Sequence, residues 1–151
     1  MNRVWVYQAN RFLTSQEVIS INELLENFVS SWTAHGSALA GKAYVVDNLF
    51  IIIEVDEEVA GVTGCSIDKS VNFIKALGEK FLIDFFDRMR VAYISESGEL
   101  AIASREEFQS LVTQGKITTE TIVYNNLVQT SEELQNKWKT TFGSSWHSRV
   151  F

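Results

Sequence analysis

The chain has 151 residues and carries 13 Lys and Arg against 19 Asp and Glu, a formal net charge of −6. Proteins that bind nucleic acid need a basic face that releases counterions from phosphates. The acidic balance and the scattered basic residues therefore disfavour nucleic acid and acidic membrane surfaces as partners. Hydrophobic residues make up 46% and aromatic residues 12%, enough for a core that needs no metal or disulfide.

Cys65 is the single cysteine. One thiol excludes an internal disulfide and a multi-cysteine zinc site, and it fits a reducing compartment. Residues 1–8 lack the apolar core of a signal peptide. The longest apolar run, 49–53, is far shorter than the ~18 residues that a membrane-spanning helix requires. We therefore expect a cytoplasmic protein with no cofactor and no metal site.

Two amphipathic helices are predicted in the first 95 residues. Thr14-Ser15-Gln16-Glu17 is a capping box, and the apolar residues that follow it, as far as Trp32, recur with helical spacing. Ser66 is placed to cap the second helix, whose apolar positions continue to Phe81.

Four strands are predicted around these helices, because their segments are rich in β-branched and aromatic residues. They cover residues 4–7, 43–46, 50–55 and 91–94. Asp47-Asn48 can form a tight turn between the second and the third strand. The order β-α-β-β-α-β predicts an α+β fold, the ferredoxin-like split βαβ plait, for residues 1–95.

The remaining residues, 96–151, read β-α-β-α. Strands are predicted at 100–102 and 121–124, and capping boxes beginning at Ser104 and Thr130 open two helices. Ser95-Glu96-Ser97-Gly98 is the best candidate boundary. We expect a C-terminal extension packed on the first 95 residues, either as a small lobe or as part of one continuous domain.

Residues 36–43 nearly spell a Walker A phosphate loop, and residues 50–57 resemble a Walker B strand. Ala43 stands where Ser or Thr must bind Mg²⁺. A phosphate loop also follows a strand and opens a helix, whereas the order here is reversed. The chain is therefore not predicted to be a phosphate-loop ATPase, and a plain helix-to-strand connection is favoured.

Gly64-Cys65-Ser66-Ile67-Asp68 is the most informative segment. A helix N-terminus favours the thiolate of Cys65 and can hold an anion through its free amides. Three readings stay open: a structural thiol, an anion or ligand site that includes Gly64 and Ser66, and thiol catalysis with His35 or His147 as the base and Asp68 nearby. We expect the structural thiol, shielded against the apolar stripe of Ile67 and Val71.

Two further segments contribute candidate ligand-binding residues. His35 is predicted in the last turn of the first helix, where it can bond terminal carbonyls or serve a site. Near the C-terminus, Trp146, His147 and Arg149 belong either to a docked tail or to the lining of a pocket or interface.

The strings 32–36, 64–68, 124–128 and 145–149 (WTAHG, GCSID, YNNLV, SWHSR) resemble a family of small uncharacterised Bacteroidetes proteins. Its members are often automatically labelled ABC-transporter ATPases. The resemblance covers the whole chain and implies one full-length domain of unknown function. It brings no functional residues, and the label conflicts with the failed phosphate-loop chemistry.

Residues 107–123 are similar, locally, to the helix–Gly–strand pattern of GYF-like modules, which bind peptides. The pattern turns at Gly115. This chain departs from those modules because it lacks the aromatic patch that they use for proline-rich ligands. Only the supersecondary pattern carries over.

Two functions are expected from these observations. The first is a non-catalytic binding or protein-interaction module, with a protein partner or a second copy of the chain in a homodimer. The alternative is a small-molecule or anion-binding enzyme whose site joins Cys65 to a histidine. A shielded Cys65 without a pocket favours the first function, and a cleft that brings Cys65 near a histidine favours the second.

Overall fold

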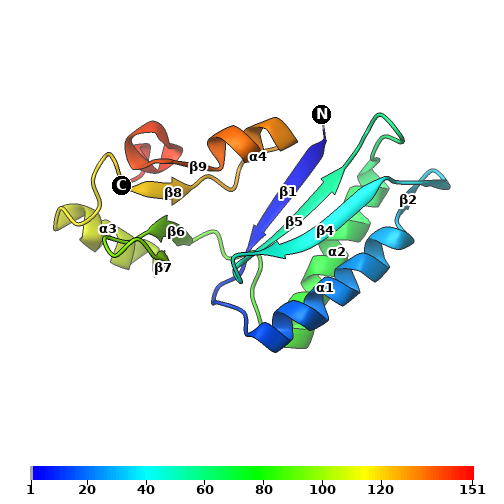
Figure 1. Cartoon of the computed structure of the whole chain (residues 1–151), viewed down its shortest axis with the longest axis horizontal. Coiled ribbons are helices and arrows are strands. Elements are labelled where there is room, and N and C mark those ends of the chain that lie inside the picture. Colours follow the sequence, from blue (N-terminus) through cyan, green and yellow to red (C-terminus); the bar gives the residue numbers. More distant parts are fainter. Residues whose placement is uncertain (1) are drawn as a thin grey trace.

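A three-stranded antiparallel sheet forms the first half of the molecule in the computed structural model, which describes residues 2–151 (Figure 1). Strands β1 (Arg3–Gln8), β4 (Gly41–Val46) and β5 (Phe50–Val55) lie in the order β1-β5-β4. Helices α1 (Ser15–Ser30) and α2 (Gly64–Phe81) run along this sheet. Central β5 is buried along its whole length, which explains why its sequence is almost continuously apolar.

Local signals set the helix starts, with one shift. The capping box at Thr14 is present, with Glu17 bonded back to the cap. The cap of α2 is Thr63 rather than the predicted Ser66. Ser66 instead occupies the third helical position, where its hydroxyl accepts from the Thr63 backbone N–H at 2.8 Å. The helix therefore begins one residue before Cys65.

The prediction that the first helix continues to His35 is wrong. Helix α1 ends at Ser30, and a small hairpin of β2 (Thr33–Ala34) and β3 (Ser37–Ala38) follows. The two residues at its tip, His35 and Gly36, have φ of 50° and 78°. Positive φ at both central residues is what a tight type I′ hairpin turn requires, so His35 cannot extend a helix.

The fourth predicted strand, β6 (Arg90–Ile94), does not join the first sheet. It pairs with β7 (Leu100–Ser104) and β8 (Ile122–Tyr124) in a second antiparallel sheet of order β7-β6-β8-β9, which β9 (Lys139–Thr141) completes. The four-stranded ferredoxin-like plait is therefore not confirmed, although the α+β class is. A short turn through Gly98, with φ of 84°, closes the β6–β7 hairpin at a low cost in loop entropy.

The C-terminal region follows the predicted β-α-β-α order and then adds elements that were not predicted. Helices α3 (Arg105–Thr113) and α4 (Ser131–Lys137) begin at the predicted caps, Ser104 and Thr130. After β9 come two short 3₁₀ turns, η1 (Phe142–Ser144) and η2 (Trp146–Arg149). No helix within residues 2–151 has the length and apolar character to cross a membrane.

One buried cluster crosses the candidate boundary at 95–98. Phe50 on β5 stacks on Tyr124 of β8 at a ring separation of 5.0 Å and meets Trp138 edge-on at 4.9 Å. A smaller cluster surrounds Phe108 of α3 within the second sheet. The first 95 residues and the C-terminal region thus share a core.

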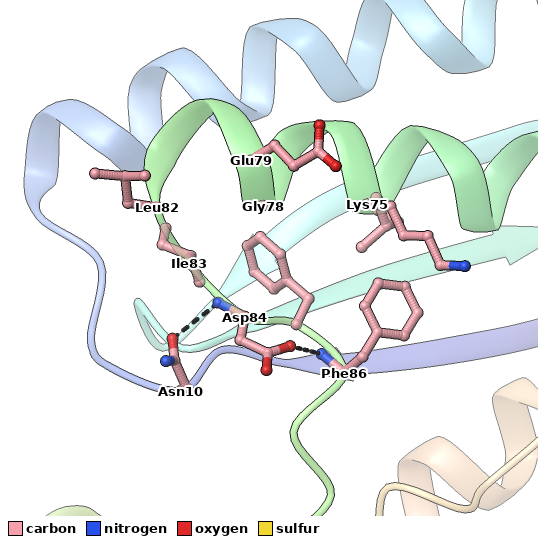
Figure 2. Close-up of a pocket in the computed structure, with 10 residues that line it drawn as sticks. Asn10, Lys75, Gly78, Glu79, Leu82, Ile83, Asp84 and Phe86 are labelled. Atoms are coloured by element: carbon pink, nitrogen blue, oxygen red, sulfur yellow. Dashed lines mark hydrogen bonds between the residues drawn. The ribbon is translucent and has the colours of Figure 1, made fainter.

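Helix α2 is followed by a residue with an unusual backbone conformation, Leu82 (Figure 2). Leu82 has φ of 56° and is 85% exposed. This left-handed position usually belongs to glycine, because a Cβ atom is strained there. Its side chain therefore contributes strain and little packing.

Replacing Leu82 by Gly is expected to raise the free energy of unfolding by about 0.5–1 kcal/mol, since relief of strain exceeds the added entropy of the unfolded chain. Urea denaturation measures the change. Leu82→Ala is the matched control, because it removes the exposed side chain and keeps the strained Cβ. A Gly variant no more stable than the Ala variant would contradict this account.

Candidate functional site

A groove of about 600 Å³ runs along the outer edge of β1, between the first sheet and the second. Strand β1 forms one wall. The opposite side comprises residues of β6 and β8, the loop 126–129 and the turn η2, and residues of α2 and the loop 85–88 complete the lining. This volume falls within the ~300–1,000 Å³ range of ordinary ligand sites.

Half of the backbone edge of β1 is open in this groove. The segment 129–131 pairs with the first half: the Val4 N–H donates to Gln129 O at 2.9 Å, and the Ser131 N–H donates to Asn2 O at 2.9 Å. Backbone groups of a strand point alternately to its two sides, so those of Val6 and Gln8 face the same edge as those of Val4. Within residues 2–151 they have no hydrogen-bond partner.

The open half exists because β6 pairs elsewhere. In the predicted plait, the fourth strand would bond to this edge of β1. Here β6 does not pair with β1; the Gln8 Nε2 atom donates instead to the Arg90 carbonyl at 3.1 Å. The Gln8 Oε1 atom accepts from Asn126 Nδ2 at 2.8 Å, so this buried amide connects the two walls of the groove.

Aromatic and apolar side chains line the groove and reach its rim. Trp5 and Trp146 are half-buried, and Tyr7 is buried against Phe86 with ring centroids 5.5 Å apart. At the rim, Phe86 is 38% exposed and Leu127 is 62% exposed. Exposed apolar residues beside a groove are typical of interaction surfaces.

The charge of the groove is opposite to that of the chain. Its lining contains Arg3, Arg88 and Arg90, with Asp87 as the single carboxylate among the described residues. Arg90 is paired with that carboxylate at 3.2 Å. Arg3 lies over the Trp5 ring at 5.1 Å, and Arg88 is exposed. The groove is therefore a basic site on an acidic molecule.

A second pocket, of about 450 Å³, brings together two of the residues predicted from the sequence. It lies between the β2–β3 hairpin and the N-terminus of α2, and both His35 and Cys65 line it. Trp32 fixes this arrangement, because its indole N–H donates to Ser66 O at 2.9 Å inside the core. Lys69 also lines the pocket, although no motif in the sequence marks it.

The expectation of a shielded Cys65 is wrong, since the thiol is exposed. Cys65 is the second residue of α2 and lies on its exposed side, whereas the next residue, Ser66, is buried. Gly64 and Ser66 line the same pocket, whereas Asp68 is exposed and lies outside its lining. The structure therefore places His35 and Cys65 of the alternative hypothesis in one pocket, and Asp68 outside it.

Two of the three C-terminal candidates, Trp146 and His147, belong to the β1 groove. His147 is buried and lines the β1 groove with Trp146, so it is not part of the Cys65 pocket. The His147 Nδ1 atom lies 2.6 Å from Ser145 Oγ, and the ring stacks on Trp146 at 3.8 Å. Trp146 Nε1 donates to Asn125 Oδ1 at 3.2 Å. Arg149 is exposed and lies outside the lining of the groove.

The Walker-like string has a structural role. Gly41–Val46 is strand β4, so no helix N-terminus follows the glycines. Lys42 pairs with the buried carboxylate of Glu54 at 3.5 Å, and the Tyr44 hydroxyl donates to the same carboxylate at 2.6 Å. This lysine therefore compensates a buried charge on β5.

Within residues 2–151, no cluster of three or more His, Cys, Asp or Glu side chains could hold a metal ion. In comparisons with protein-family models, curated proteins and solved structures, none matches the chain. The candidate sites are therefore argued from their geometry.

Cys65 is expected to react with a thiol reagent in the folded protein at a rate within about tenfold of the denatured chain, because it is exposed. Cys65→Ser should change the free energy of unfolding by no more than about 0.5 kcal/mol. Stopped-flow labelling and urea titration measure the two quantities. Reaction only after denaturation would show that the thiol is shielded after all.

Proposed function

We propose that this chain is a non-catalytic protein-interaction module whose binding site is the groove along β1. The observation that carries the proposal is the open half-edge of β1 inside a groove of about 600 Å³. Backbone groups in such a place are satisfied only by water until a partner strand arrives. Exposed Phe86 and Leu127 at the rim add apolar area that a partner can cover.

The proposal is tested with a library of random peptides displayed on phage and selected against the immobilised full chain. Enriched peptides are then synthesised and titrated against three forms of the protein: the natural chain, Leu127→Glu and Ile19→Glu. The two variants are matched, because each replaces an exposed apolar residue, 62% and 56% exposed, by the same charge. Only Leu127 lines the groove.

Peptide affinity should fall at least about tenfold in Leu127→Glu and stay unchanged in Ile19→Glu, since rim residues exclude water from the contact. Selection of no binding peptide, or equal binding by both variants, would refute the groove as the interaction site.

A second function, a small-molecule or anion-binding enzyme, is favoured by the pocket that Cys65 and His35 share. Lys69 supplies a positive charge there, and the Gly64 and Cys65 amides belong to the first turn of α2, where backbone donors are free. For this function, inorganic phosphate should slow the labelling of Cys65, and His35→Ala should alter its pH profile. If neither phosphate nor His35→Ala changes the labelling of Cys65, this second function is excluded.

A further inference from the structure

We infer that the occupant of the β1 groove is an extended acidic segment of a partner protein, which adds as a strand to the open half of β1. This inference rests on the proposed function and specifies the class of partner. Its two parts, strand addition and acidity, come from different observations.

Strand addition follows from the way the intramolecular pairing stops. The segment 129–131 bonds to β1 around Arg3 and then leaves the edge, so pairing ends after Val4. Val6 and Gln8 offer the next donors and acceptors in the same row. Hydrogen-bonding groups on one edge of a strand recur every two residues, and a neighbouring strand bonds to them with the same spacing. Main-chain bonds of this kind supply affinity in β-strand addition, and side-chain pockets supply specificity.

Acidity follows from the charges around that row. Arg90 is already paired with Asp87, while Arg3 and Arg88 have no carboxylate within ion-pair distance in residues 2–151. A carboxylate in the groove would meet these two guanidinium groups, which form short charge-assisted hydrogen bonds. A basic segment would meet repulsion there, so the groove discriminates by charge.

The apolar lining explains why a polypeptide fits better than a free anion. Trp5, Trp146 and Leu127 offer area that only a chain with side chains of its own would cover. Successive side chains of a strand point to opposite faces. Arg3 and Trp5 lie on the same face of β1, with Arg3 over the Trp5 ring, so a segment that carries both acidic and apolar residues meets a guanidinium group and an aromatic ring together.

The test uses peptides of about eight residues, an ordinary strand length, that share their apolar positions. Their alternate residues are Glu, Gln or Lys, and a fourth peptide repeats the Glu sequence with N-methylated backbone amides. Each is titrated against the full chain by fluorescence anisotropy at low and at physiological salt. Two charge-reversal variants, Arg88→Glu in the groove and Lys116→Glu outside it, are compared after their melting curves confirm folding.

The Glu peptide should bind at least about tenfold more tightly than the Gln peptide, and the Lys peptide should bind least. N-methylation should weaken binding at least tenfold, because it removes main-chain donors. Added salt should weaken the binding of the Glu peptide, and Arg88→Glu should weaken it as well. Lys116→Glu should leave the affinity unchanged.

Several results would overturn the inference. Equal binding of the three charge forms would leave the groove as an interaction site without an acidic partner. Insensitivity to N-methylation, or displacement of the peptide by free glutamate at similar concentration, would exclude strand addition. Self-association in sedimentation that Leu127→Glu abolishes would make a second copy the occupant. Binding of none of the peptides, together with an empty phage selection, would refute the proposed function itself.

Discussion

Replacing Phe50 by Ala is expected to lower the free energy of unfolding by about 3–5 kcal/mol, the range for a large aromatic removed from a closed core. Phe50 is fully buried on the central strand β5, and its ring contacts Tyr124 of the second sheet and Trp138, the residue that ends α4. The cavity would therefore open between the two halves of the chain. Because both halves line it, the loss should appear in one cooperative unfolding transition.

Urea denaturation followed by circular dichroism and tryptophan fluorescence tests this expectation. Phe108→Ala is the matched comparison, since Phe108 is also fully buried but belongs to the smaller cluster. It should cost a similar amount. Two separate transitions, or a loss below about 1 kcal/mol for Phe50→Ala, would show that residues 1–95 and 96–151 do not share a core.

The second large effect is a pH dependence from His147. Burial lowers the pKa of this imidazole from 6.5 to about 4, because the charged form is poorly solvated in the core. The unfolded chain therefore binds a proton near pH 6.5 and the folded chain does not. The contribution of His147 to the free energy of unfolding is therefore fully present above pH 6.5. It is lost as the pH drops toward 4, by up to about 3 kcal/mol.

His147→Gln isolates this effect, because glutamine does not titrate. The difference in unfolding free energy between the natural chain and the variant, measured from pH 7 to pH 4, should shrink as the pH falls. Glu17 does not interfere, since its bond to Arg11 lowers its carboxyl pKa to about 2 and its contribution changes below about pH 4.5. Parallel stability curves for the two proteins would show that His147 is not buried in its neutral form.

The sequence was most informative where the physics is local. Thr14, Ser104 and Thr130 each cap the helix that they predict, because a cap depends on side-chain and backbone groups within three residues. The turn at Asp47-Asn48 also forms, with positive φ at both residues. Thr63 and Ser66 both carry a hydroxyl group that could cap α2. The spacing of the apolar residues did not indicate which of the two is the cap.

Long-range choices were less predictable. Strand β6 has two edges: β7 occupies one, and β1 or β8 could take the other. The β6–β7 hairpin forms because the turn through Gly98 is short, and β8 takes the second edge with Tyr93 opposite Val123, whereas pairing with β1 would join residues more than 80 positions apart. Strand propensity is the same in either sheet, so the sequence pattern did not indicate which pairing would form.

The candidate sites divide in the same way. His35 and Cys65 were selected from local motifs, and the structure places both in one pocket. The β1 groove was missed because it depends on the pairing of β6 and on five separate segments of the chain meeting. Of its lining, only Trp146 and His147 were selected beforehand, from their unusual place near the chain end. No sequence signal marks Val6 and Gln8 as residues with an open backbone edge.

Amide hydrogen exchange at Val6 and Gln8, read by NMR, tests the open edge of β1 most directly. In the free protein these two amides should exchange on the order of 100-fold faster than those of Trp5 and Tyr7, which face β5. Addition of the Glu peptide should slow Val6 and Gln8 and leave Trp5 and Tyr7 unchanged. Equal protection of all four amides in the free protein, or no slowing at Val6 with saturating peptide, would contradict the account.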